Sequence, residues 1–196
     1  ELKPWQYLFV NCDSRNYGFQ LFRMTRLFIQ NIIVGVPRKL KNIIAVSEFS
    51  AKILRRHLKS GINITVIQNP VDKLGPKIDT SKNNTFLYVG RLSKEKGIEI
   101  FCEAVTEAGV KAIVVGDGDL KKELEKKYKN IEFVGWQNRD GIYKYMKKAK
   151  ALVFPSLCYE TASMVTTEAS LCGIPCIVNS NCAAADILKN KENVLF

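Results

Sequence analysis

Residues 85–119 have the sequence TFLYVGRLSKEKGIEIFCEAVTEAGVKAIVVGDGD, which carries the clearest signal of the fold class. Two short apolar runs, residues 85–89 and 111–115, flank a segment with helical spacing, residues 95–108. Each run is followed directly by a loop that contains glycine. Short apolar runs predict buried strands, and a helix between two of them predicts that the strands pair in parallel.

The same alternation continues toward the C-terminus. Further strands are expected at residues 131–134, 151–154 and 175–178. Further helices are expected at residues 120–128, 140–147, 164–172 and 183–188. We therefore predict an α/β fold with a doubly wound, Rossmann-like parallel sheet and helices on both faces. Ligands of such sheets bind beyond the carboxyl ends of the strands, so the loops after the strands are the candidate site.

The N-terminal part predicts a portion of a second α/β domain. Strands at residues 43–46 and 64–67 flank a helix at residues 48–60, which Ser47 caps. Residues 71–84 are poor in large apolar side chains and contain a Gly-Pro pair, so we predict a linker there.

The domain prediction assigns residues 1–70 to the C-terminal part of one domain, 71–84 to an interdomain linker and 85–196 to a second domain. The sequence begins at Glu1 without a methionine and ends at Phe196 within a strand-like pattern. We therefore expect a piece of a longer protein, with the second domain truncated at its C-terminal end.

Residues 19–34 form a mostly apolar segment that is too short and too polar to span a bilayer. Its polar side chains share one helical face, namely Gln20, Arg23, Arg26 and Gln30. The opposite face carries Leu21, Phe28 and Ile32. Two alternatives stay open: a helix that packs in a core, or a helix that lies on an anionic membrane surface.

Composition narrows the function less than the loops do. Lys and Arg number 30 against 19 Asp and Glu, and the net charge of +11 favours anionic partners without choosing among nucleotide, nucleic acid and acidic lipid. Six cysteines form no Cys-x-x-Cys pair, and His57 is the one histidine. This usage argues against a disulfide framework or a zinc site and fits a reducing compartment.

The first two strand-end loops differ in charge. The loop at residues 90–97 has glycine at both ends and carries Arg91 and Lys96 ahead of a helix, an arrangement that suits phosphate. Taken alone, the loop is explained as well by two ordinary surface cations, so both alternatives stay open. The loop at residues 116–119 is Gly-Asp-Gly-Asp, but Lys121 stands where a dinucleotide fingerprint has its third glycine. We therefore expect a plain strand-to-helix turn at this second loop and disfavour a nicotinamide cofactor.

The third loop, residues 135–139, carries Trp136 and Gln137. An aromatic ring beside an amide side chain suits a planar base, which it can stack on and hydrogen-bond. A half-buried tryptophan in a turn explains the pattern as well, so both alternatives stay open.

The fourth loop runs into the predicted helix at residues 164–172 and is flanked by two carboxylates. Glu168 lies in an otherwise apolar helix, where a carboxylate is costly to bury unless it finds donors. Ribose hydroxyls are such donors, and a sugar ring near Glu160 would supply others. The backbone amides around Ser163, Met164 and Val165 can hold a diphosphate. Together the loops predict a site for a nucleoside-diphosphate sugar.

In this order and spacing, the motifs resemble the donor domain of glycosyltransferase family 4, a retaining family with the GT-B fold. The matching runs are residues 89–97, 114–118, 133–135, 154–156, Glu160-x7-Glu168-Ala169 and 172–175. Upstream, residues 45–50 and 66–72 resemble the end of the acceptor domain and its hinge.

The resemblance implies a role for each candidate residue. Arg91 and Lys96 would hold the donor diphosphate and stabilise the departing nucleotide, and Glu160 would bind the transferred sugar; these three are the catalytic candidates. The remaining donor-binding candidates are Gly90, Trp136, Gln137, Ser163, Met164, Val165 and Glu168, with the last on the ribose. The family retains anomeric configuration, by front-face attack assisted by the leaving phosphate, and uses neither a metal nor another cofactor.

The sequence also departs from the family pattern. Thr161 and Ser163 stand where the family tends to have glycine, and Pro70 stands where hinge glycine is common. His57 does not match the catalytic histidine of many relatives, and we expect it on a helix surface. The chain alone is expected to bind donor poorly and to turn over little or nothing.

The predicted function is transfer of a sugar from a nucleoside-diphosphate sugar to a glycan or lipid-linked acceptor, with retention, in cell-surface polysaccharide or lipopolysaccharide synthesis. We expect a cytoplasmic enzyme with a peripheral contact at the inner face of an anionic membrane and no nucleic-acid partner. Two alternatives are a non-hydrolysing sugar-nucleotide epimerase-like enzyme and a non-catalytic basic module for nucleic acid or membrane. The second would need cations clustered with exposed aromatics, whereas these cations are spread along the chain.

Overall fold

A computed structural model describes residues 16–35, 39–189 and 194–195. The chain divides into two compact units, Glu1–Ile43 with Leu54–Thr65, and Ile44–Ile53 with Val66–Phe196. Interpretations that involve Cys12 and Phe196 lie outside the described residues. The domain boundaries predicted at residues 70 and 85 stay predictions.

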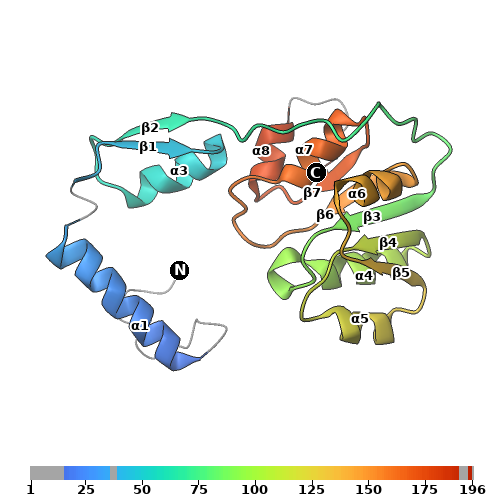
Figure 1. The fold of residues 1–196 in the computed structure, drawn as a ribbon, viewed down its shortest axis with the longest axis horizontal. Coiled ribbons are helices and arrows are strands. Elements are labelled where there is room, and N and C mark those ends of the chain that lie inside the picture. Colours follow the sequence, from blue (N-terminus) through green and yellow to red (C-terminus); the bar gives the residue numbers. More distant parts are fainter. Residues whose placement is uncertain (1–15, 36–38, 190–193, 196) are drawn as a thin grey trace. The chain divides into compact units, whose positions relative to one another are not determined.

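The second unit is built on a six-stranded parallel sheet with the order β5-β4-β3-β6-β7-β8 (Figure 1). Its strands are β3 (Thr85–Val89), β4 (Lys111–Val115), β5 (Ile131–Gly135), β6 (Ala149–Phe154), β7 (Cys176–Val178) and β8 (Val194–Leu195). Since β3 lies in the middle and later strands are added on either side, the sheet is doubly wound, as predicted.

Helices cover both faces of this sheet. They are α4 (Ile98–Glu107), α5 (Lys121–Lys127), α6 (Arg139–Met146), α7 (Met164–Leu171) and α8 (Ala183–Leu188). Successive side chains of a strand point to opposite faces. Accordingly, Leu87 and Val89 belong to one apolar cluster with residues of α6, α7 and α8, whereas Tyr88 belongs to another with residues of α4 and α5. The α/β fold class predicted from the sequence is confirmed.

The helix predicted over residues 95–108 is wrong at its beginning. The chain forms a short 3-10 turn, η3 (Lys94–Lys96), and α4 begins only after Gly97. Gly97 adopts φ 68°, a left-handed conformation that breaks the helical path. A Cβ atom at this position would overlap the carbonyl oxygen of Pro155, so Gly97 also lets the β3 and β6 loops meet.

The strands β1 (Asn42–Ala45) and β2 (Asn63–Val66) form a two-stranded sheet. The helix α3 (Glu48–His57) lies between them in the sequence. The predicted cap is confirmed: the Ser50 amide donates to Ser47 Oγ at 3.1 Å, and the Ser47 amide donates to Ser50 Oγ at 3.1 Å. The helix ends three residues before the predicted Ser60. His57 is exposed at its end, as expected.

The apolar segment near the N-terminus forms α1 (Tyr17–Phe28), which continues as a π-helical turn, η2 (Ile29–Ile33), rather than as one regular helix. The apolar side chains expected to pack are exposed, at 49% for Leu21 and 56% for Phe28, while Gln20 is buried. Core packing of that face is therefore not seen among the described residues, and the membrane alternative stays a prediction. None of the described helices is long and apolar enough to cross a bilayer.

The predicted linker, residues 71–84, contains neither helix nor strand and belongs to the second unit. Leu74 and Ile78 contact the core cluster that includes α7, and the Ile78 amide donates to the Cys172 carbonyl at 2.8 Å. The Tyr143 hydroxyl donates to the Pro76 carbonyl at 3.1 Å. These contacts fix the path of the chain beside α6 and α7.

Candidate active site

The loops that follow β3 and β4 pack backbone against backbone. Gly116 adopts φ 143°, and a Cβ atom there would overlap the carbonyl oxygen of Gly90. A side chain at Gly118 would meet the backbone of Leu92 in the same way. The glycines of the second loop therefore serve this close approach, which agrees with the plain turn predicted there. Asp117 of this loop pairs with Lys121 at 3.1 Å.

A hollow of about 330 Å³ opens at the ends of these strands. Its lining comes from the loops after β3, β4 and β5 and from α6, namely Val89, Gly90, Arg91, Val115, Gly116, Asp117, Trp136, Gln137 and Ile142. Four predicted donor-binding residues thus line one hollow: Gly90, Arg91, Trp136 and Gln137.

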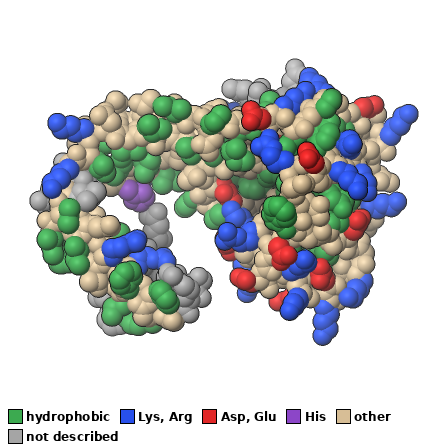
Figure 2. Space-filling view, in the orientation of Figure 1, with side chains coloured by type: hydrophobic (Ala, Val, Ile, Leu, Met, Phe, Trp, Pro, Cys, Tyr) green, Lys and Arg blue, Asp and Glu red, His purple; other side chains and the backbone are tan. Residues whose placement is uncertain are grey.

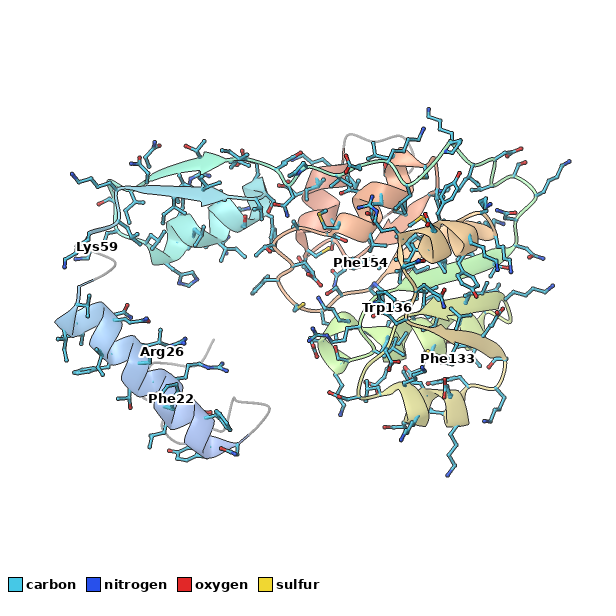
Figure 3. The ribbon with its side chains drawn as sticks, in the orientation of Figure 1. Phe22, Arg26, Lys59, Phe133, Trp136 and Phe154 are labelled. Atoms are coloured by element: carbon cyan, nitrogen blue, oxygen red, sulfur yellow. The ribbon has the colours of Figure 1, made fainter. Side chains whose placement is uncertain are left out.

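Trp136 follows β5 and is 72% exposed, so the alternative of a half-buried turn tryptophan is wrong (Figure 3). Its neighbour Gln137 is partly used by the protein, because its amide nitrogen donates to the Val134 carbonyl at 3.1 Å. An indole with a free face beside an anchored amide suits stacking on a planar group.

The backbone of the first loop is held by a buried phenol. The hydroxyl of Tyr88 donates to the Arg91 carbonyl at 2.9 Å. Burial raises the pKa of Tyr88, so the phenol stays a donor throughout the physiological range. The Arg91 side chain is exposed, and it has no ion-pair partner in the described part of the chain. Its charge can therefore meet an anion in the hollow.

Lys96 and Glu160, predicted to hold phosphate and sugar, form an ion pair with each other. Ser156 Oγ donates to the same Glu160 oxygen at 3.0 Å. The backbone supports this pairing, since the Leu157 amide donates to the Glu95 carbonyl at 2.9 Å and so ties the fourth loop to the first. Two predicted catalytic residues from loops far apart in sequence are thus brought together.

Glu168 is buried within α7, at 8% exposure. Burial raises the pKa of this carboxyl, and the positive charge of Arg139, whose Nη2 atom lies 3.4 Å from Glu168 Oε1, partly offsets the rise. The sequence prediction of a carboxylate in an apolar helix is confirmed. Its predicted contact with ribose stays a prediction.

The remaining candidates lie at the start of α7. Ser163 is the N-cap residue, 4% exposed, yet its hydroxyl makes no capping bond and has no partner among the described residues. Its carbonyl accepts from the hydroxyls of Thr166 and Thr167, at 3.1 and 3.0 Å. Met164 is 40% exposed, whereas Val165 packs against the core, so Val165 can offer a ligand only its backbone amide.

Two residues of the site were not singled out from the sequence. Ser156 carries no distinctive signal, because a serine after a strand is common. Arg139 did carry one: it is the first residue of α6, and a helix N-terminus disfavours a cation. A cation in that position indicates a partner elsewhere in the fold.

The resemblance predicts a mechanism without a metal ion, and this stays a prediction. In residues 16–35 and 39–189, no three His, Cys, Asp or Glu side chains gather closely enough to hold an ion. The five described cysteines form no disulfide bond with one another.

The loops after the strands of this doubly wound sheet bring a cation and a carboxylate together, Lys96 and Glu160, and leave Arg91 exposed. The chain matches the family model described as glycosyl transferases group 1 over residues 73–196, well over half its length. It therefore belongs to this glycosyltransferase family.

Among relatives, the chain is 31% identical over 159 residues to an uncharacterized glycosyltransferase of Methanocaldococcus jannaschii, a match that covers 79% of this chain and 44% of the relative. The chain spans less than half the length of the curated relatives it first matches.

Solved structures have the same fold. The lipopolysaccharide outer core galactosyltransferase WaaB is 25% identical with a TM-score of 0.58, covering 70% of this chain and 42% of that one. Anabaena HepE in complex with UDP and glucose is 22% identical with a TM-score of 0.61, covering 83% and 48%. These neighbours support the GT-B architecture expected from the sequence, and the family match favours a glycosyltransferase over the epimerase-like alternative.

Proposed function

We propose that this chain carries the donor site of a retaining glycosyltransferase, which moves a sugar from a nucleoside-diphosphate sugar to a glycan or lipid-linked acceptor. The observation that carries the proposal is the meeting of Lys96 and Glu160 from two strand-end loops. Arg91 lines the hollow at the strand ends, and Glu168 is a buried carboxyl of the helix that follows the Glu160 loop. Cations for phosphate and carboxylates for hydroxyls are the groups that such a donor requires.

Each group has a task in the transfer. When the bond between the sugar and the diphosphate breaks, negative charge develops on the leaving phosphate oxygen, and Arg91 and Lys96 stabilise that charge without a metal ion. Glu160 accepts hydrogen bonds from the sugar hydroxyls. Glu168 accepts them from the ribose, and Trp136 stacks on the base. Retention follows if the acceptor attacks on the face that the phosphate leaves, so that the phosphate can take the acceptor's proton.

The donor class and the pathway are extrapolated from relatives. Because HepE was solved with UDP and glucose, a uridine nucleotide is the first donor to test. WaaB acts in lipopolysaccharide synthesis, as its name states, so a cell-surface glycan made at the cytoplasmic face of a membrane is the proposed setting. On the face shown in Figure 2, Lys and Arg are scattered among Asp and Glu over the second unit, and this scatter speaks against a nucleic-acid surface.

The test is thermal unfolding of the chain with UDP, GDP, ADP or CDP. At least one nucleotide is expected to raise the midpoint, and replacing both Arg91 and Lys96 by Met should abolish the rise. The control replaces Lys126 and Lys129, two exposed cations near α5, by Met, which changes the net charge equally. If the nucleotide still raises the midpoint after Arg91 and Lys96 are replaced, the proposed site is wrong. If the rise is lost equally in the control variant, the nucleotide responds to the overall positive charge and not to this site.

A further inference from the structure

Arg139 has no role in the proposed transfer, yet it contacts a residue that has one. Its Nη2 atom lies 3.4 Å from Oε1 of Glu168 and donates a hydrogen bond of 3.1 Å to the carbonyl oxygen of Asp72. The guanidinium therefore bridges α7 and the segment that precedes β3. Although the side chain is 56% exposed, its charged end is held by two acceptors.

The position of Arg139 is otherwise unfavourable. It is the first residue of α6, where the unpaired amide groups of the helix repel a positive charge. Asp140 beside it is the residue type that this first turn favours. The helix itself does not stabilise the charge of Arg139. The favourable contacts of this side chain are therefore those with Glu168 and with the Asp72 carbonyl.

The charge of Arg139 matters because little else acts on Glu168. Burial raises the pKa of that carboxyl and Arg139 lowers it. Other titratable groups occur on α6 and on the other elements packed around α7: Asp140, Tyr143, Lys144, Tyr145, Lys77, Lys150, Cys176 and Asp186. Asp186 is paired with Lys189 at 3.1 Å, and none of these eight groups shifts the pKa of the Glu168 carboxyl. Within the described residues, Arg139 supplies the charge that opposes the rise in the pKa of this buried carboxyl.

We propose that Arg139 is a positioning residue of the donor site, which holds the Glu168 carboxylate ionised and oriented so that it accepts hydrogen bonds from the ribose hydroxyls. The inference rests on the proposed function, in which Glu168 binds the ribose. Arg139 needs no contact with the nucleotide. Its contact with Glu168 is with one carboxylate oxygen, Oε1, at 3.4 Å.

The first readout is the pH dependence of UDP affinity, measured by titration calorimetry on the 196-residue chain between pH 5 and 8. Without Arg139, Glu168 takes up a proton at a higher pH, and a protonated carboxyl has lost part of its acceptor capacity. For Arg139→Met we expect affinity about tenfold weaker near pH 6 and a fall that begins at a higher pH than in the unsubstituted chain. The titration of UDP itself is common to both curves and cancels in their difference.

The second readout is the ribose. The unsubstituted chain is expected to prefer UDP over 2′,3′-dideoxy-UDP, which lacks both hydroxyls, and Arg139→Met should shrink that preference severalfold. Lys144→Met removes an exposed cation from the same helix and should change neither readout. Arg139→Lys, which keeps the charge but not the planar fork, should recover most of the pH profile. If Arg139→Met does not fold, Arg139→Gln gives the same comparison.

The outcomes separate the two levels of the argument. If the chain binds none of the four nucleoside diphosphates, the proposed function and this inference both fail. If it binds UDP and Arg139→Met keeps the pH profile and the ribose preference, only the role of Arg139 is overturned. Tighter UDP binding by Arg139→Met would overturn it in a different way, by showing that Arg139 competes with the ribose for the carboxylate.

Discussion

The surroundings of Glu160 and of Glu168, eight residues apart on either side of the start of α7, differ in how each carboxylate is satisfied. Their side chains are similarly exposed, at 14% and 11%. Glu160 accepts from Lys96 and from the Ser156 hydroxyl. Glu168 has one charged neighbour, Arg139, at 3.4 Å. Exposure therefore does not distinguish the two sites, whereas the number of donors does.

The difference teaches how a ligand would enter each site. In the proposed site, a sugar at Glu160 would replace donors already in place, because Lys96 would have to turn from the carboxylate toward a phosphate. A ribose at Glu168 adds donors where the protein supplies few. We therefore expect exchange at the first carboxylate, with a small net effect on affinity, and a clear gain at the second.

The largest effect on stability should come from disrupting the contact between the loops after β3 and β6, where Gly97 packs against Pro155. Gly97→Ala introduces a left-handed alanine at φ 68° and a Cβ atom that overlaps the Pro155 carbonyl oxygen. We expect a loss of about 2–4 kcal/mol in unfolding free energy, from strain and overpacking together. Chemical denaturation measures this loss of unfolding free energy. Because the two loops would move apart, the Lys96–Glu160 ion pair should also be lost in Gly97→Ala.

Gly109→Ala is the matched control. Gly109 adopts φ 62°, but open space surrounds the position that its Cβ atom would take. Only the left-handed strain remains there, about 1 kcal/mol. Equal losses for the two variants would show that the contact between the β3 and β6 loops is unimportant.

The next effect sharpens the comparison itself. Glu168→Gln removes the carboxylate expected to accept from the ribose, and UDP affinity should fall about tenfold, since hydrogen bonds to charged groups contribute roughly 1.5–3 kcal/mol. The loss should be much smaller for 2′,3′-dideoxy-UDP. A variant that binds both nucleotides as well as the unsubstituted chain does would remove Glu168 from the site.

The sequence predicted strands and loops better than side-chain partners. The strands β3 and β4 and the helix α8 have the bounds that their apolar patterns indicated, because those patterns are local. The first turn of α4 was wrong because Gly97 takes a left-handed conformation and packs against Pro155, nearly sixty residues later, a contact that no local pattern reveals. For the same reason the sequence singled out Lys96 and Glu160 separately but not their pairing. Arg139 was missed because its partners come from two other segments.

A smaller effect concerns stability without ligand. Burial raises the pKa of Glu168 in the folded chain, so the native state holds that proton more tightly than the unfolded state does. The resulting stabilisation is present below the unfolded pKa and is lost as pH rises through the folded one. Glu168→Gln lacks this dependence, so its melting temperature should exceed that of the unsubstituted chain at pH 8, and the difference should shrink as the pH is lowered.

The smallest effect tests the exchange expected at Glu160. Glu160→Gln releases Lys96 from its ion pair, so the cation becomes available to the diphosphate before any sugar arrives. UDP affinity should then stay the same or rise about twofold, because a partly exposed ion pair contributes less than about 1 kcal/mol. The additional affinity of UDP-glucose over UDP should disappear, since the sugar loses its acceptor. Calorimetry with both ligands measures this, and Ser156→Ala should show a weaker form of the same pattern.

A large loss of UDP affinity in Glu160→Gln would contradict the exchange, because it would mean that Glu160 positions Lys96 for the phosphate instead of competing for it.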